Sequence, residues 1–215
     1  MGCVAMKKII VLCLLCASMF ASMGARSEVT EPDMLIRNVA EEVLSAVRQE
    51  NVDPANNPHN LMSIVGTRVL PHFDFVRMTR LAAGKDWHRA TPKQKDMLVT
   101  EFRNLLVNTY ANAFSRYRDQ TVEVMPVSPH PDADKVTVRT LILKPGAQRI
   151  AVDYEMEKTS DGWKVFDLTV EKISLAIVYR SIFAQQVEQG GIEGLIKTLT
   201  DKNAANKASH QHEED

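Results

Sequence analysis

Beyond its sixteenth residue the 215-residue sequence contains no cysteine. Its cysteines, Cys3, Cys13 and Cys16, all lie in the N-terminal segment. Once that segment is removed, the chain cannot form a disulfide, hold a metal through thiolates or use a cysteine nucleophile. Such a chain depends on its hydrophobic core for stability, and about 190 residues suffice for one domain with a substantial core.

The sequence also lacks an apolar run long enough to span a bilayer comfortably. The apolar run over residues 9–20 is well short of the roughly 20 residues that a transmembrane helix needs. Lys7 and Lys8 precede this run and small residues follow it, which is the pattern of a secretory signal peptide. We expect residues 1–25 to be this signal peptide, with cleavage after Gly24 or Ala25. The alternative is an uncleaved anchor, whereas a lipoprotein signal would need a small residue before its cysteine.

A strong net charge of either sign is missing. Without Lys7 and Lys8, 24 basic residues stand against 27 acidic ones, a net charge of −3. A nucleic-acid partner would favour a basic face, and electrostatic adhesion to an anionic membrane would favour an excess of cations. The overall charge therefore points to neither partner.

The common catalytic and nucleotide-binding motifs are absent. The chain has no GxSxG elbow, phosphate loop, dinucleotide fingerprint or HExxH helix. The histidines of the main chain lack partners at metal-ligand spacing, and those of the tail are interpreted as solvated: His59, His72, His88 and His130, then His210 and His212. We therefore expect no metal and no cofactor.

Acidic residues on neighbouring predicted strands give the one case for acid–base chemistry. Asp153 and Asp167 could work as a pair if both faced a concave surface. We favour structural roles, with Asp153 on a polar strand face and Asp167 paired to a nearby Arg or Lys. Asp74 is interpreted as a helix cap, and Arg180 as a member of a structural ion pair.

Residues 70–114 carry two helices with their start and stop signals. Pro71 is expected to block the preceding helix, Asp74 to cap the first helix and Gly84 to end it. Thr91 opens the second helix with Pro92 at its first position, and Gln94 completes a capping box. Apolar residues then recur at helical spacing and are rich in aromatics toward the end: Leu98, Phe102, Leu105, Leu106, Tyr110 and Phe114.

Further helices are predicted over residues 32–49, about 60–70, 174 to about 189 and 192 to about 199. Breakers separate them, namely a loop over residues 51–58 and the pair Gly190-Gly191. From Asp201 the chain is polar, and we expect residues 201–215 to be a disordered tail. One domain over residues 26–200 follows.

Between these helices, apolar residues recur at every second position, which is the spacing of β-strands. Strands are predicted over residues 121–126, 135–143, 148–158 and 163–171, and Asp161-Gly162 is a strong hairpin signal. The alternation slips at Val165 and Phe166, which predicts a bulge or a sharp curvature there. The fold class is therefore α+β, with a helical layer packed on a strongly curved four-stranded antiparallel sheet in a single domain with an apolar pocket.

The predicted helices and the predicted sheet together present more apolar surface than a single hydrophobic core would bury. A curved sheet with helices across its concave side often leaves a cavity, although for any single residue a place in the core is the default interpretation. Without a catalytic set, this pattern favours a carrier of apolar ligands. The candidate lining residues are Phe75, Val76, Leu106, Tyr110, Phe114, Val152, Tyr154 and Phe183.

Several motifs together resemble the MlaC family, also called toluene-tolerance auxiliary components. The similar segments are the Pro-His-Phe-Asp-Phe run at 71–75, Gly84 and Trp87, the Thr-Pro-Lys-Gln helix start at 91–94, the Asp-Gly-Trp-Lys-Val hairpin at 161–165 and the Tyr-Arg-Ser run at 179–181. They cover nearly all of the chain after the leader. The chain departs from the family pattern at Glu171-Lys172-Ile173, where a glycine is expected.

The resemblance implies a periplasmic phospholipid carrier and not an enzyme. Such a protein would shuttle lipid between an outer-membrane lipoprotein–porin complex and the substrate-binding ring of an inner-membrane ABC transporter, with transient membrane contact, and so maintain outer-membrane lipid asymmetry. Two alternatives remain open. One is an enzyme of the helix-plus-curved-sheet cone class with Asp153, Asp167 and Arg139 at its pocket floor; the other is a periplasmic chaperone or adaptor whose groove takes a protein segment.

Overall fold

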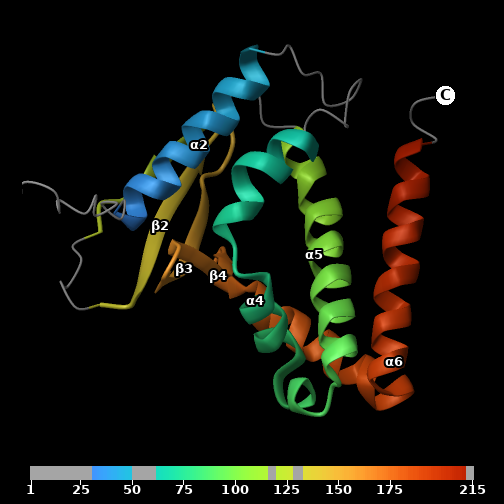
Figure 1. The fold of residues 1–215 in the computed structure, drawn as a ribbon. Coiled ribbons are helices and arrows are strands. Elements are labelled where there is room, and N and C mark those ends of the chain that lie inside the picture. Colours follow the sequence, from blue (N-terminus) through green and yellow to red (C-terminus); the bar gives the residue numbers. More distant parts are fainter. Residues whose placement is uncertain (1–30, 50–61, 116–119, 128–132, 212–215) are drawn as a thin grey trace, which may run out of the picture.

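The structure is a computed structural model that describes residues 31–49, 62–115, 120–127 and 133–211. It has an α+β architecture, as the sequence predicts, with helices accompanying an antiparallel sheet. Figure 1 shows one helix lying along the sheet, in nearly the direction of β2, and the other helices standing to the side of the sheet as a separate helical layer. The main helices are α2 (Pro32–Gln49), α4 (Phe75–Ala83), α5 (Pro92–Ser115) and α6 (Leu175–Gln211). The predicted signal peptide and the loop over residues 51–58 lie outside the described residues.

Helix α2 has the bounds that the sequence predicts. Pro32 occupies its first position, where the missing N–H of proline has no helical partner to lose. Ile36 is 7% exposed and packs into the apolar face of the sheet. Near the other end, Val43 packs with Val65 of the next helical segment, so α2 ties the sheet to the chain that follows.

The next helical segment ends close to the predicted residue. It finishes in a π-helical turn, η1 (Val65–Val69), and a separate 3-10 turn follows, η2 (Leu70–His72). The earlier segment thus does not continue through Pro71, which lies near the start of the 3-10 turn, where its missing N–H is not needed. Phe73 then becomes extended and forms a parallel bridge with Val165 in the sheet.

Helix α4 begins and ends at the predicted residues. The Asp74 carboxylate accepts a hydrogen bond from the N–H of Arg77 at 2.8 Å, which satisfies a free donor of the first turn. Gly84 ends the helix at a φ of 56°, a conformation that favours glycine. Arg180 does not form the predicted ion pair here; its Nε donates to the carbonyl of Leu81 at 2.9 Å, where the last helical carbonyls need donors.

A short 3-10 helix, η3 (Gly84–His88), leads to α5, which starts with the predicted capping box. The N–H of Thr91 donates to Oε1 of Gln94 at 2.8 Å, and the N–H of Gln94 donates to Oγ1 of Thr91 at 3.3 Å. Two free donors of the first turn are thereby satisfied reciprocally. Leu98 and Phe102 are each 1% exposed, so the predicted stripe of α5 is buried.

The sheet contains five strands in sequential order, one more than predicted. They are β1 (Thr121–Val124), β2 (Lys135–Leu143), β3 (Ile150–Thr159), β4 (Gly162–Val170) and β5 (Ile173–Ser174). The additional strand has two residues and follows a turn in which Glu171 and Lys172 both have positive φ angles, 48° and 68°. No glycine marks this turn, so the usual sequence signal of a tight hairpin is absent.

A bulge in β4 lies where the alternation slips. Glu155 of β3 pairs with Asp167, whereas the next residue, Met156, pairs with Val165. Phe166 is therefore the extra residue, as the sequence predicts. In Figure 1 β4 runs in a direction clearly different from that of β2, in keeping with a strongly bent sheet.

The register gives the sheet an apolar and a polar face. On the polar face, Oγ1 of Thr137 donates to Glu155 at 2.9 Å, and Arg139 faces Asp153 with its Nε 3.9 Å from the carboxylate. The apolar face is formed by Val122, Val124, Val136, Val138, Thr140, Ile142, Ile150, Val152, Tyr154, Met156, Trp163, Val165, Leu168 and Val170.

Helix α6 starts at the predicted cap and continues far beyond its predicted end. Oγ of Ser174 accepts from the N–H of Ile177 at 3.2 Å. At Gly191 the backbone leaves the helical region, with φ 66° and ψ −170°. In Figure 1 the helix passes behind α4 and the lower end of α5, turns, and then rises beside α5.

The expectation of a disordered tail from Asp201 is wrong, because helix α6 extends to Gln211. Asn203 is 4% exposed, and its Nδ2 donates to the backbone carbonyl and the carboxylate of Glu101 in α5, at 2.9 and 2.7 Å. These bonds, together with good helix formers such as Ala204 and Ala205, compensate for the polar sequence. Residues 212–215 lie outside the described residues.

Candidate functional site

Among the residues that the structure describes, the buried apolar side chains fall into separate clusters. The helical cluster joins α4, α5 and α6 and consists of Met78, Ala82, Ala83, Ala90, Leu98, Phe102, Leu105, Leu106, Phe183, Leu195, Ile196 and Leu199. The sheet cluster joins α2 to the sheet and consists of Ile36, Val124, Val138, Met156, Trp163 and Val165. Ligand sites are concave and mostly apolar, so the boundary between these two clusters is the candidate site.

Phe73 connects the two clusters. It packs against both of them while remaining partly buried itself. Its ring stacks on Phe75 with the ring centroids 5.7 Å apart. The parallel bridge to Val165 fixes Phe73 at the sheet, so this aromatic pair has a defined position between the two apolar layers.

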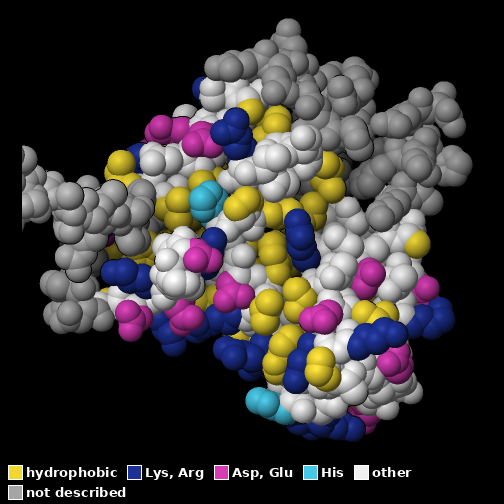
Figure 2. Space-filling model, viewed as in Figure 1, with side chains coloured by type: hydrophobic (Ala, Val, Ile, Leu, Met, Phe, Trp, Pro, Cys, Tyr) yellow, Lys and Arg dark blue, Asp and Glu magenta, His cyan; other side chains and the backbone are white. Residues whose placement is uncertain are grey.

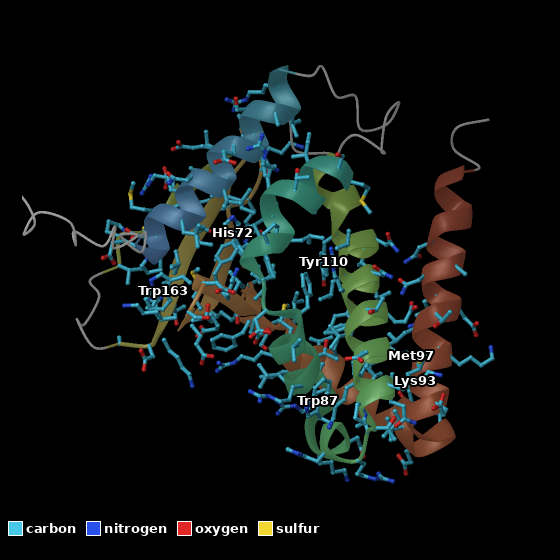
Figure 3. All side chains as sticks on the ribbon, in the orientation of Figure 1. His72, Trp87, Lys93, Met97, Tyr110 and Trp163 are labelled. Carbon is cyan, nitrogen blue, oxygen red and sulfur yellow. The ribbon has the colours of Figure 1, made fainter. Side chains whose placement is uncertain are left out.

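A pair of tyrosines lies on the helical side of this boundary. Tyr110 of α5 and Tyr179 of α6 share a side-chain hydrogen bond, and burial raises the pKa of Tyr179 to about 12. The ring of Tyr179 packs edge-on against Phe102 and Phe183, with centroids 4.8 and 5.9 Å away. Figure 3 shows Tyr110 pointing from α5 toward the middle of the molecule. Both hydroxyl groups are therefore held at the edge of an apolar layer.

Tyr154 is the matching residue on the sheet side. It packs against the sheet cluster, and burial raises the pKa of its hydroxyl, which is hydrogen-bonded to Thr140. Oγ1 of Thr140 in turn donates to the carbonyl of Val152 at 2.9 Å. The polar atoms on this part of the apolar face are thus satisfied within the sheet.

Cationic side chains border the aromatic boundary. The guanidinium of Arg103 lies 5.6 Å from the centroid of Phe75, and that of Arg77 lies 3.9 Å from the centroid of Phe166. Arg77 also forms an ion pair with Glu157, which ties α4 to β3. Figure 2 shows hydrophobic side chains gathered in the middle of the viewed face with basic side chains among and below them.

The structure places the predicted lining residues at different depths. Leu106 and Phe183 lie inside the helical cluster, 6% and 1% exposed, and Val152 is 7% exposed on the sheet. Phe75, Tyr110 and Tyr154 are partly buried at the boundary, whereas Val76 is 56% exposed on α4. The side chain of Phe114 lies outside the described residues. Their role in lining a ligand site stays a prediction.

Two boundary residues are missing from that prediction. Phe73 directly follows the 3-10 turn, and only its pairing with Val165 shows that it joins the clusters. Tyr179 precedes the predicted Phe183 by one helical turn, so the same spacing that selects Phe183 also selects Tyr179. The helical period gave a usable signal for Tyr179, but no local signal marks Phe73.

The two candidate acid–base residues have structural partners. Oδ1 of Asp167 accepts from the N–H groups of Leu168 and Ala176 at 2.8 and 3.0 Å, and Oδ2 accepts from Ser174 at 2.5 Å. The predicted partner, Arg or Lys, is wrong, because the carboxylate sits at the start of α6 and caps it. Asp153 faces Arg139, as a residue of the polar face would.

His72 and His88 are the histidines whose side chains the structure describes, and neither belongs to a ligand set. His72 is partly buried beside η2, where burial and the positive charge of Lys164 lower its pKa, and His88 is exposed. Within the described ranges, no group of three or more His, Cys, Asp or Glu side chains could hold a metal ion. The same part of the chain has no helix with the length and hydropathy of a membrane span.

Known proteins resemble the chain in both sequence and fold. The MlaC protein family model matches residues 37–201. This chain belongs to the MlaC family. It is 22% identical over 169 residues to toluene tolerance protein ttg2D of Pseudomonas putida, covering 78% of each chain. It is also 22% identical over 149 residues to the intermembrane phospholipid transport system binding protein MlaC of Haemophilus influenzae, covering 68% of this chain and 70% of that one.

A solved MlaC-like fold gives the structural counterpart. The phospholipid-binding protein from Ralstonia solanacearum, determined in complex with a phospholipid, superposes with a TM-score of 0.76 at 30% identity. The match covers 83% of this chain and 99% of that protein. The family membership and the fold class expected from the sequence are thereby confirmed.

Proposed function

We propose that this MlaC-family protein binds a diacyl phospholipid and carries it across the periplasm. One observation carries the proposal. The apolar sheet face and the helical cluster are separate layers joined by the partly buried Phe73, and Phe75 and Tyr110 pack on the helical side of this junction. Acyl chains placed between the two layers would contact apolar side chains on both sides. The phospholipid bound by the Ralstonia protein of the same fold supports this assignment.

The physical need for such a carrier follows from the hydrophobic effect. Each CH₂ group exposed to water costs about 0.8 kcal/mol, so two acyl chains cannot cross an aqueous gap unaided at a useful rate. A protein that offers a second apolar environment removes most of this barrier. The net free energy of transfer can then be close to zero, and direction is set by the partners that load and unload the carrier.

The phospholipid headgroup stays at the surface in this arrangement. Burying a phosphate without partners would be costly, and the polar atoms of Tyr154 and Thr140 are already satisfied within the sheet. Arg103 lies beside Phe75 at the boundary and offers a cation near the surface. Recognition would therefore rest on the acyl chains more than on the headgroup.

The proposed location and partners follow from the leader and from the family. The segment with Lys7, Lys8 and a short apolar run has the pattern of a signal peptide, which supports export across the inner membrane. The carrier would exchange lipid with an outer-membrane lipoprotein–porin complex and with the substrate-binding ring of an inner-membrane ABC transporter. Such exchange would maintain the lipid asymmetry of the outer membrane.

Native mass spectrometry of the leader-free protein, purified without detergent, tests the proposal. We expect a population heavier than the chain by the mass of one or more phospholipids, together with phospholipid in the organic extract. A matched mock purification sets the background. Protein free of phospholipid above that background contradicts the proposal.

The same preparation separates the two alternatives. A chaperone or adaptor would co-purify with peptide in place of lipid. An enzyme would convert bound phospholipid to a lysed product, and that conversion would depend on Asp153 or Asp167. The carrier instead releases intact phospholipid to acceptor vesicles, which chromatography of the extracted lipids shows directly.

A further inference from the structure

The first half of α6 is apolar on more than one side. Tyr179 and Phe183 face the helical cluster, yet exposed aliphatic residues lie on other sides of this segment and in β5 directly before it. Ile173 is 59% exposed, Ile177 63%, and Val178 and Ile182 38% each. An amphipathic surface helix normally carries polar residues away from its core face. This stripe of Ile173, Ile177, Val178 and Ile182, called the α6 stripe below, is therefore apolar surface without a cover among the described residues.

The α6 stripe is bordered by cations. Lys172 directly precedes Ile173, and Arg180 follows Ile177 at a spacing of three residues on the helix. Between Lys172 and Val187 the chain carries no acidic residue. Glu171, which directly precedes Lys172, accepts from the N–H of Ala151 through Oε1 at 2.5 Å, and Asp167 accepts from Ser174.

The β2–β3 hairpin adds two more cations at the same end of the sheet. Glu171 pairs with Ala151 through its N–H at 3.0 Å, so Lys172 lies at the level where β3 begins. Lys144 and Arg149 are the exposed ends of the connection between β2 and β3. This end of the sheet is therefore basic, although the leader-free chain as a whole has an excess of acidic residues.

We propose that the α6 stripe and its basic border, Lys144, Arg149, Lys172 and Arg180, dock the protein on an anionic phospholipid surface. Ile173 and Ile177 enter the boundary between headgroups and acyl chains, and the cations remain at the level of the phosphates. Val178 directly precedes Tyr179, so docking brings the Tyr110–Tyr179 pair toward the bilayer. The proposal rests on the proposed function, because a lipid carrier must meet a membrane or a membrane complex.

The charge and composition of the α6 stripe and its border favour a lipid surface over a second copy of this chain or another protein partner. A second copy docked by the same face would bring like charges together across a two-fold axis. Protein interfaces are enriched in aromatic residues and methionine at their centres, whereas the α6 stripe is entirely isoleucine and valine. Aliphatic side chains with a ring of Lys and Arg match an acidic bilayer without any requirement for shape.

Vesicle co-sedimentation of the leader-free protein tests the docking surface. The vesicles are phosphatidylcholine alone or phosphatidylcholine with phosphatidylglycerol. We expect binding to the anionic vesicles that weakens with added salt. The double variant Arg149→Gln/Lys172→Gln should bind about 30-fold less, since each cation near an anionic surface contributes a factor of about five to six and the two factors multiply. The double variant Ile173→Ser/Ile177→Ser should lose binding at low and high salt alike.

Matched control variants remove exposed apolar residues or exposed cations at positions outside the α6 stripe and its border. Met34→Ser/Met97→Ser removes apolar residues that are 46% and 38% exposed on α2 and α5, and Lys85→Gln/Lys202→Gln removes exposed cations. Both controls should bind vesicles like the unmodified protein. Binding that is absent in the unmodified protein, or equal in the stripe variants and the controls, overturns the proposal, and in that case a protein partner becomes the occupant to test.

Lipid occupancy, measured by native mass spectrometry on the same variants, keeps the two proposals apart. The stripe variants should keep their bound phospholipid and their melting temperature while vesicle binding falls. A protein that binds vesicles but never carries phospholipid refutes the proposed function and leaves the docking surface standing. A protein that carries phospholipid but ignores vesicles refutes the docking surface alone.

Discussion

Tyr110 and Tyr179 are joined by a hydrogen bond between their side chains, and this bond links the end of α5 to the first half of α6. It lies at the edge of the helical cluster, where Tyr179 packs on Phe102. In this bond one phenol donates and the other accepts, so it satisfies one of the two O–H donors within an apolar layer. The pair therefore fixes the relative position of the two helices that form one wall of the proposed lipid site.

The first prediction concerns alkaline pH. Burial raises the pKa of Tyr179 to about 12, while an unfolded tyrosine titrates near pH 10. The folded state thus keeps a proton that the unfolded state loses, so this contribution to stability is complete below about pH 10 and disappears as the pH rises through about 12. Urea unfolding at about pH 9 and about pH 11 should show a smaller decrease for Tyr179→Phe than for the unmodified protein. An equal decrease would show that Tyr179 does not titrate in this way.

The second prediction concerns Asp167, which caps α6 through Ser174 and Ala176. Asp167→Asn should lower the free energy of unfolding by about 1–2 kcal/mol, because the cap loses its charge and one acceptor. Asp153→Asn, the control on the exposed face of β3, should change it by at most about 1 kcal/mol. Both variants should still transfer phospholipid. A folded Asp167→Asn protein that binds lipid but no longer produces a lysed product would favour the enzyme instead.

The third prediction separates lining residues from core residues. Leu106 and Leu98 lie on the same helix and belong to the same cluster, but only Leu106 lies one turn from Tyr110. Leu106→Trp should lower the phospholipid occupancy measured by native mass spectrometry, with a modest change in the melting temperature of the emptied protein. Leu98→Trp should instead lose stability by overpacking, by about 1–3 kcal/mol. Equal occupancy in Leu106→Trp and the unmodified protein would remove Leu106 from the lining.

The fourth prediction concerns the turn between β4 and β5. Lys172 has a φ of 68°, a conformation that costs a non-glycine residue roughly 1–2 kcal/mol. Lys172→Gly should therefore raise the free energy of unfolding by up to about 1 kcal/mol while reducing binding to anionic vesicles. Lys144→Gly, in the neighbouring hairpin, removes a cation without relieving a positive φ and should not stabilise the protein. Destabilisation by Lys172→Gly would contradict the turn conformation.

The fifth prediction concerns the last part of α6. Asn203 donates to two oxygens of Glu101, and a buried hydrogen bond that loses one partner costs about 1–3 kcal/mol. Asn203→Ala should lower the free energy of unfolding by this amount, while Lys202→Ala, at the exposed neighbouring position, should have little effect. Urea denaturation followed by circular dichroism measures both. A free energy of unfolding unchanged in Asn203→Ala would indicate that this segment does not pack on α5.

The sequence predicted those features that short segments determine. The caps at Asp74 and Thr91 and the bulge at Phe166 depend on residues within one turn or one strand. The end of α6 was mispredicted because Asn203 is stabilised by Glu101, a residue about 100 positions earlier. Composition near residue 201 carries no information about that contact.

The candidate site was predictable only as a set of apolar stripes. Leu106 and Tyr110 share one helical period, yet one is buried in the helical cluster and the other lies at the boundary. Their difference arises from what α6 and the sheet place against each residue. Phe73 shows the same limit, since its position depends on pairing with Val165 across the fold.

Phe166, the extra residue in β4, shifts the phase of the strand, because it changes whether odd-numbered or even-numbered side chains face the apolar side. Before it, Trp163 and Val165 face the apolar side at odd positions; after it, Leu168 faces that side at an even position. The shift also turns Asp167 away from the apolar face and toward the start of α6. Deletion of Phe166 would restore a single phase, so one half of β4 would have to turn its side chains over. A one-residue change in length would thus disturb the apolar face and the helix cap together, whereas a substitution at the same position leaves the phase intact.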